Sequence, residues 1–66
     1  MEVVINGMPR QVADEMSLAQ AVALLTTSAT GVAAAINGEV VRRGAWESTR
    51  LATGDRVEVI TAVQGG

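Results

Sequence analysis

The sequence predicts a small α+β domain in which one helix packs on a mixed sheet of four to five strands. Two Asn-Gly pairs, Asn6-Gly7 and Asn37-Gly38, each separate two short apolar runs. This is the strongest short-range signal for a β-hairpin. An amphipathic segment lies between the two hairpins, and an alternating segment follows the second. With 66 residues, 48% of them hydrophobic, the chain can fill one core and no more.

The first predicted hairpin joins residues 2–5 to residues 8–12. Its two-residue connection supplies the two positive-φ positions that a type I′ turn requires. Pro9 lies in the returning strand and has no N–H to donate to a neighbour. The returning strand is therefore expected at an edge of the sheet.

The predicted helix begins at Ser17, because Ser17 and Gln20 have the spacing of a capping box. Apolar residues then recur at the i, i+3, i+4 and i+7 positions of one helical stripe. They are Leu18, Ala21, Val22 and Leu25. Asp14 and Glu15 precede this start, where carboxylates favour interaction with the helix dipole. Gly31 marks the end of the connection to the next strand.

The second predicted hairpin joins residues 32–36 to residues 39–41. Residues 42–50 are polar and irregular in pattern around Trp46, the only aromatic residue of the chain. A lone large aromatic has much area to bury, so Trp46 is interpreted as a lid over one end of the core. Residues 52–55 are predicted to form a turn.

The last predicted strand, residues 56–61, alternates with period 2. Val57 and Val59 are expected on the core face, and Ile60 on the opposite face together with Val4. Exposed apolar side chains on such a face are typical of a docking surface. Val4 and Ile60 are therefore candidate partner contacts.

The composition excludes most catalytic classes. The chain contains no Cys, no His and no Lys, which removes thiol nucleophiles, thiolate metal sites, imidazole acid–base chemistry and Schiff bases. No metal site and no bound cofactor are expected. A domain of this size is also too small to enclose a substrate. The sequence therefore predicts a protein that is not itself an enzyme.

The charge and apolar pattern limit the partners. A formal net charge of −2 disfavours nucleic acid, whose phosphates require an excess of basic residues. The pair Arg42-Arg43 is interpreted as a solvated charge run rather than a site for an acidic partner. No apolar run is long enough for a signal peptide or a membrane span. A cytoplasmic protein that is monomeric when free is expected, with no contact to nucleic acid or membrane.

Residues 62–66 are interpreted as a flexible tail on a single domain of residues 1–61. The tail ends in Gly65-Gly66, and a frayed terminus is the plain alternative to a function. The chain nevertheless has one group that a partner can activate, the terminal carboxylate, which adenylation by ATP makes reactive. Glycines without a Cβ leave the carbonyl uncrowded and pass through a narrow channel. Extended, five residues reach about 17 Å.

Several segments of the sequence form a recognisable pattern. They are Ala35-Ile36-Asn37-Gly38-Glu39-Val40-Val41, the following Arg43 and Trp46, Gly54-Asp55-Arg56-Val57-Glu58-Val59, and Ala62-Val63-Gln64-Gly65-Gly66. Together they resemble the ThiS family, the small sulfur carrier proteins of thiamine thiazole biosynthesis, and the likeness covers essentially the whole chain. Arg42 departs from the family pattern, because many members have Pro at this position. The turn at Arg42 is therefore expected to be less rigid.

The resemblance implies a ubiquitin-like β-grasp fold and a carrier function. A ThiF-like adenylyltransferase would use ATP to adenylate Gly66, and a cysteine desulfurase would supply the sulfur that converts it to a thiocarboxylate. A ThiG-like thiazole synthase would receive this sulfur. Gly65, Gln64 and Val63 would thread into the partner, and Arg43 would contact its surface.

Three alternatives stay open on the sequence alone. A molybdopterin-type sulfur carrier shares the fold and the Gly-Gly end. A ubiquitin-like modifier would acylate protein amines through the same terminus. A plain β-grasp interaction module would need neither of its terminal glycines.

Overall fold

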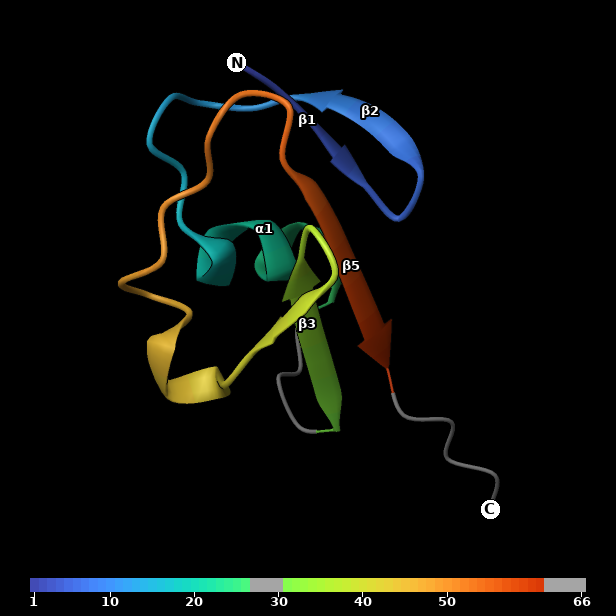
Figure 1. The fold of residues 1–66 in the computed structure, drawn as a ribbon, viewed down its shortest axis with the longest axis vertical. Coiled ribbons are helices and arrows are strands. Elements are labelled where there is room, and N and C mark those ends of the chain that lie inside the picture. The colour runs from blue at the N-terminus through green and yellow to red at the C-terminus, as the bar shows by residue number, and fades with distance from the viewer. Residues whose placement is uncertain (27–30, 62–66) are drawn as a thin grey trace.

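In the computed structural model, which describes residues 1–26 and 31–61, five strands form one mixed sheet with a helix packed on one face (Figure 1). The elements in chain order are β1 (Glu2–Ile5), β2 (Met8–Gln11), α1 (Leu18–Leu25), β3 (Val32–Ile36), β4 (Glu39–Val41), a 3-10 helix (Arg43–Ala45) and β5 (Arg56–Thr61). The strand order is β2-β1-β5-β3-β4, with β1 and β5 parallel and the other neighbours antiparallel. The predicted α+β fold class is confirmed.

Both predicted hairpins are present, and the left-handed conformation of their turn residues explains why. Asn6 and Gly7 have φ values of 51° and 80°, and Asn37 and Gly38 have values of 50° and 86°. Two successive positive φ angles define the type I′ turn, whose twist matches that of the strands it joins. β2 ends at Gln11, one residue before the predicted boundary, and is an edge strand as predicted.

The capping box at the start of α1 is formed as predicted. The Gln20 N–H donates to Ser17 Oγ at 3.1 Å, and the Ser17 N–H donates to Gln20 Oε1 at 2.9 Å. The predicted apolar stripe is wrong at its last position, because Leu25 is 38% exposed. The buried residues of α1 all lie in its first five positions, so the last turn extends beyond the part of the helix that the core covers.

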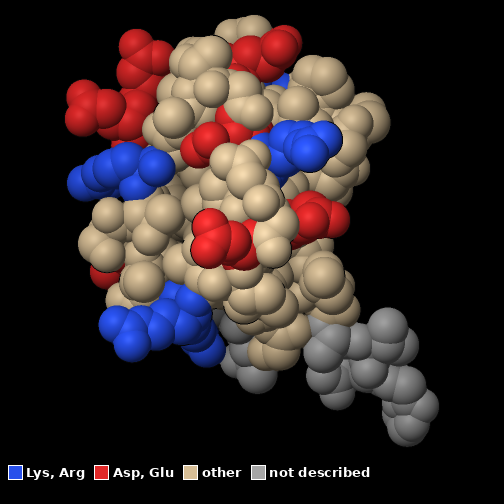
Figure 2. All heavy atoms as spheres, in the orientation of Figure 1, with Lys and Arg blue, Asp and Glu red and all other residues tan. Residues whose placement is uncertain are grey.

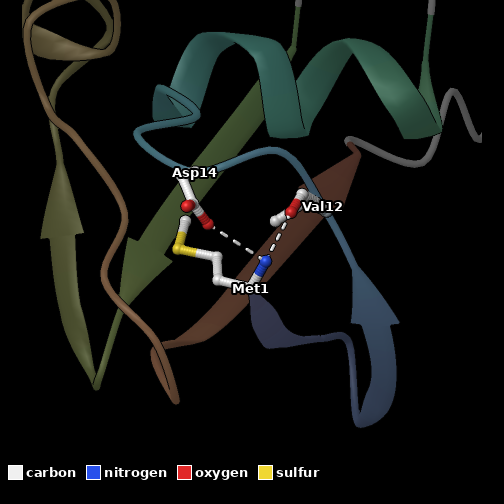
Figure 3. Close-up of polar contacts among 3 residues, drawn as sticks. All are labelled: Met1, Val12 and Asp14. Carbon is white, nitrogen blue, oxygen red and sulfur yellow. Dashed lines mark hydrogen bonds and ion pairs between the residues drawn. The ribbon is translucent and has the colours of Figure 1, made fainter.

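Asp14 pairs with the start of the chain rather than with the start of α1 (Figure 3). The α-ammonium group of Met1 donates to the Val12 carbonyl at 2.8 Å and lies 3.2 Å from Asp14 Oδ1. Glu15 is exposed and has a φ of 64°. Neither carboxylate lies in the first turn of α1. Asp14 is 86% exposed, so its ion pair contributes little to stability.

The core lies between the sheet and α1, and loop residues close it at one end. Its buried members are Val3, Ile5, Leu18, Ala21, Val22, Ala34, Trp46, Leu51, Val57 and Val59. Trp46 is 5% exposed, and its Nε1–H donates to the Val41 carbonyl at 2.8 Å, consistent with the predicted lid. Arg42, just before the 3-10 helix, has a φ of −64°. Proline is fixed near this φ, so the turn keeps a proline-compatible geometry without a proline.

Candidate functional site

The predicted reactive residue, Gly66, and its neighbours Gly65, Gln64 and Val63 lie outside the described residues. The structure therefore defines the site up to Thr61, the last residue of β5. β5 is the central strand of the sheet, and β3 pairs with it from Val57 to Thr61. The segment that precedes the tail is thus anchored in the sheet to its last residue.

Two asparagine side chains hold β5, one from each Asn-Gly turn. Asn6 Oδ1 accepts from the Val59 N–H at 2.8 Å, and Asn6 Nδ2 donates to the Val59 carbonyl at 3.2 Å. Asn37 Oδ1 accepts from the Arg56 N–H at 2.9 Å, and Asn37 Nδ2 donates to Asp55 Oδ1 at 3.1 Å. Asn37 therefore holds the beginning of β5, and Asn6 holds it two residues before its end.

The face of the sheet opposite α1 carries an apolar patch beside the end of β5. Ile60 is 64% exposed and lies opposite Ala33, and Val40 is 78% exposed and lies opposite Ala35. Because β3 lies between β4 and β5, these residues form one continuous surface, here called the open-face patch. It consists of Ala33, Ala35, Val40 and Ile60, and it is bordered by the exposed Glu58, which lies opposite Ala35.

Sequence analysis identified Ile60 but not the other three residues of the open-face patch. The available signal was the two-residue turn at Asn37-Gly38, which fixes the register of the hairpin. That register places Val40 opposite Ala35, and cross-strand partners share a face.

The other two predicted contact residues lie away from the open-face patch. Val4 shares the open face but is in register with Arg56, four positions before Ile60, or about 13 Å along a strand. Arg43 lies on the α1 side of the molecule, where it lines a groove with Val22 and Trp46. The structure therefore does not bring Val4, Ile60 and Arg43 together.

The charges on the face shown in Figure 2 are interspersed, with blue and red side chains alternating over it. On this face the surface beside the end of β5 is formed by uncharged residues. Within residues 1–26 and 31–61, no three Asp, Glu, His or Cys side chains are grouped so that they could hold a metal ion. No helix in these ranges is long and apolar enough to cross a membrane.

Comparison with known proteins gives consistent results. The model of the ThiS family matches residues 3–66. A crystal structure of the thiamine biosynthesis protein ThiS from Geobacter metallireducens is similar over the full length of both chains, with 33% identity and a TM-score of 0.83. A solution structure of a thiamine biosynthesis protein from the same organism has 30% identity and a TM-score of 0.81, covering all of this chain and 88% of the other. A search of curated proteins finds no match.

Proposed function

The chain belongs to the ThiS family, and on this premise we propose that it is a sulfur carrier whose terminal glycine delivers sulfur for the thiazole of thiamine. The observation that carries the proposal is the extent of the family match, which runs to residue 66 and includes Gly65-Gly66. The C-terminal carboxylate of Gly66 is the reacting group. The folded body serves as the part that partner enzymes recognise.

The proposed chemistry takes place on a partner enzyme in two steps. A carboxylate oxygen of Gly66 attacks the α-phosphorus of ATP, the bond to the β-phosphate breaks, and pyrophosphate leaves. Hydrosulfide then attacks the acyl carbon, and AMP leaves with the carbon–oxygen bond electrons. Where a cysteine desulfurase supplies the sulfur from cysteine, it does so as a persulfide, and a thiol reductant must then cleave the acyl disulfide that forms first. The product is a thiocarboxylate, a soft nucleophile that stays attached to its carrier.

The position of β5 supports this separation between a reacting terminus and a body that partner enzymes recognise. Thr61 is hydrogen-bond paired within the sheet, and the five residues after it can span at most about 17 Å. This reach lets the terminus enter a neighbouring active site while the body stays outside. Gly65, Gln64 and Val63 are proposed to thread into the partner's channel, where the missing Cβ of Gly65 permits close approach of the backbone.

The proposed partners are a ThiF-like adenylyltransferase, which binds the ATP, and a ThiG-like thiazole synthase, which receives the sulfur. The open-face patch is the proposed docking surface, because it is apolar, exposed and beside the origin of the tail. The carrier itself is proposed to perform no catalysis and to bind no cofactor.

Intact-mass analysis tests the proposal directly. Incubation with the adenylyltransferase, ATP and a sulfide source should convert the protein to a species heavier by one exchange of oxygen for sulfur. Addition of thiazole synthase and its substrates should return the original mass. A reductant-resistant conjugate to protein amines would instead identify a modifier, and an unchanged mass would contradict carrier function. Recovery of the original mass only with a molybdopterin-forming enzyme would assign the other sulfur pathway.

Substitution Ile60→Arg should weaken binding to the adenylyltransferase. A charge in the centre of an apolar contact typically raises the dissociation constant about tenfold or more. Ile60 is exposed, so the free energy of unfolding should change by less than about 0.5 kcal/mol. Titration calorimetry and urea denaturation measure the two effects.

Met8→Arg is the matched control, because Met8 is also apolar and 65% exposed. Met8 pairs with the core residue Ile5, so it lies on the other face of the sheet at its edge. Equal binding losses in the two variants would show that the open-face patch is not the docking surface.

A further inference from the structure

The two edges of β5 are supported unequally. β3 pairs with β5 through Thr61, whereas β1, within the described residues, pairs with it only at Arg56 and Val57. The Asn6 N–H adds a last backbone bond to the Val57 carbonyl at 2.8 Å, after which the chain turns away toward β2. Among residues 1–26 and 31–61, no strand therefore neighbours the β1 edge of β5 from Val59 onward.

The side chain of Asn6 continues the ladder that β1 leaves unfinished. Its carboxamide presents a carbonyl to the Val59 N–H and an N–H to the Val59 carbonyl, which are the two bonds that β1 would make to Val59 if it continued beside β5. A side-chain amide has the same donor and acceptor groups as a peptide unit. Asn6 thus extends the support of this edge by two residues toward the tail.

We infer that Asn6 is a positioning residue, which fixes the direction in which β5 leaves the body and so aims the C-terminal glycine at the partner's active site. This inference rests on the proposed function. A tail that starts from a fixed strand loses less conformational entropy on entering a channel than a tail whose first residue can move. Asn6 acts here through Val59 and does not touch the reacting atoms.

A simpler interpretation is that Asn6 is present because the turn needs a residue that tolerates positive φ. The molecule provides its own control for this interpretation. Asn37 has nearly the same φ, also precedes a glycine and also makes two side-chain bonds to the β5 region. It does so at the beginning of the strand, next to Asp55 and Arg56, away from the tail.

The first test compares Asn6→Gly with Asn37→Gly. Glycine keeps each type I′ turn free of strain and removes only the carboxamide, so both variants are expected to fold. In Asn6→Gly, the ¹⁵N order parameters of Ile60 and Thr61 should fall from about 0.85 toward about 0.6, the boundary of flexible backbone. In Asn37→Gly they should stay at the wild-type value. Unchanged order in Asn6→Gly would overturn the inference.

The second test measures pyrophosphate release with the adenylyltransferase, ATP and each variant as substrate. The efficiency kcat/KM should fall about tenfold for Asn6→Gly, chiefly through KM, because the enzyme must order a looser tail. For Asn37→Gly the loss should stay below about twofold. Asn6→Asp, which can accept from the Val59 N–H but cannot donate to its carbonyl, should give an intermediate loss.

Equal losses of kcat/KM in the two glycine variants would show that the effect comes from lower stability alone, and would overturn the positioning role. Failure of the proposed function itself looks different, because the wild-type protein would then form no thiocarboxylate that thiazole synthase consumes, whether or not pyrophosphate is released. The order parameters are measured on the free protein and do not depend on any partner.

Discussion

Deletion of Gly65 and Gly66 is expected to abolish thiocarboxylate formation and to leave the fold unchanged. The deletion moves the terminal carboxylate to Gln64, which shortens the reach by two residues, or about 7 Å, and places a side chain beside the acyl carbon. The described core ends at Val59, so the free energy of unfolding should change by less than about 0.5 kcal/mol. Intact mass after treatment with adenylyltransferase, ATP and sulfide measures the first effect, and urea denaturation measures the second.

Gly66→Ala separates the two causes of this loss. The variant keeps the full reach and adds only a methyl group next to the reacting carbonyl, so partial conversion to the thiocarboxylate is expected. A truncated protein that still gained sulfur at the wild-type rate would contradict the assignment of Gly66 as the reacting residue.

Leu18→Ala is expected to unfold most of the protein. Leu18 is fully buried at the start of α1, and a Leu→Ala change at such a site lowers the free energy of unfolding by about 2–5 kcal/mol. A core of this size rarely contributes more than about 3–5 kcal/mol in total. The loss therefore matches the whole stability of the domain. Trp46 belongs to the same core cluster, so its fluorescence during urea titration reports the effect.

Leu24→Ala is the matched control for this substitution. It removes the same atoms from the same helix, but Leu24 is 48% exposed, so the loss should be below about 1 kcal/mol. A cooperative transition at the wild-type urea concentration in Leu18→Ala would show that the helix does not anchor the core.

The fold was predictable from sequence because its signals are local. Each Asn-Gly pair fixes a turn through backbone conformation alone, and the Ser17–Gln20 capping box requires two residues three positions apart. Alternation in β5 assigned Val57 and Val59 to the core, as observed. These features depend little on what the rest of the chain does.

Features that depend on distant segments were not predictable. The exposure of Leu25 reflects how far the core extends along α1, which helical periodicity does not report. The pairing of Asp14 with the Met1 ammonium group arises because β1 and β2 bring residues 1 and 12 together. Sequence spacing indicates neither the exposure of Leu25 nor the ion pair of Asp14.

The candidate site was predictable in its chemistry but only in part in its surroundings. The Gly-Gly end could be recognised from composition and motif, whereas the open-face patch requires the register of three strands. The bonds from Asn6 to Val59 join residues 53 positions apart. Asn6 was predictable as a turn residue, but its contact with β5 follows from the parallel placement of β1 beside that strand.

The parallel arrangement of β1 and β5 also separates the first residue from the end of β5, which lie at opposite ends of the sheet (Figure 1). In a protein of this sequence, which has no lysine, the α-amine of Met1 is the one target for amine-directed reagents. A fluorophore or a surface attachment introduced there would modify a single, defined atom. Such a probe would stand clear of the end of β5 during measurements with partner enzymes.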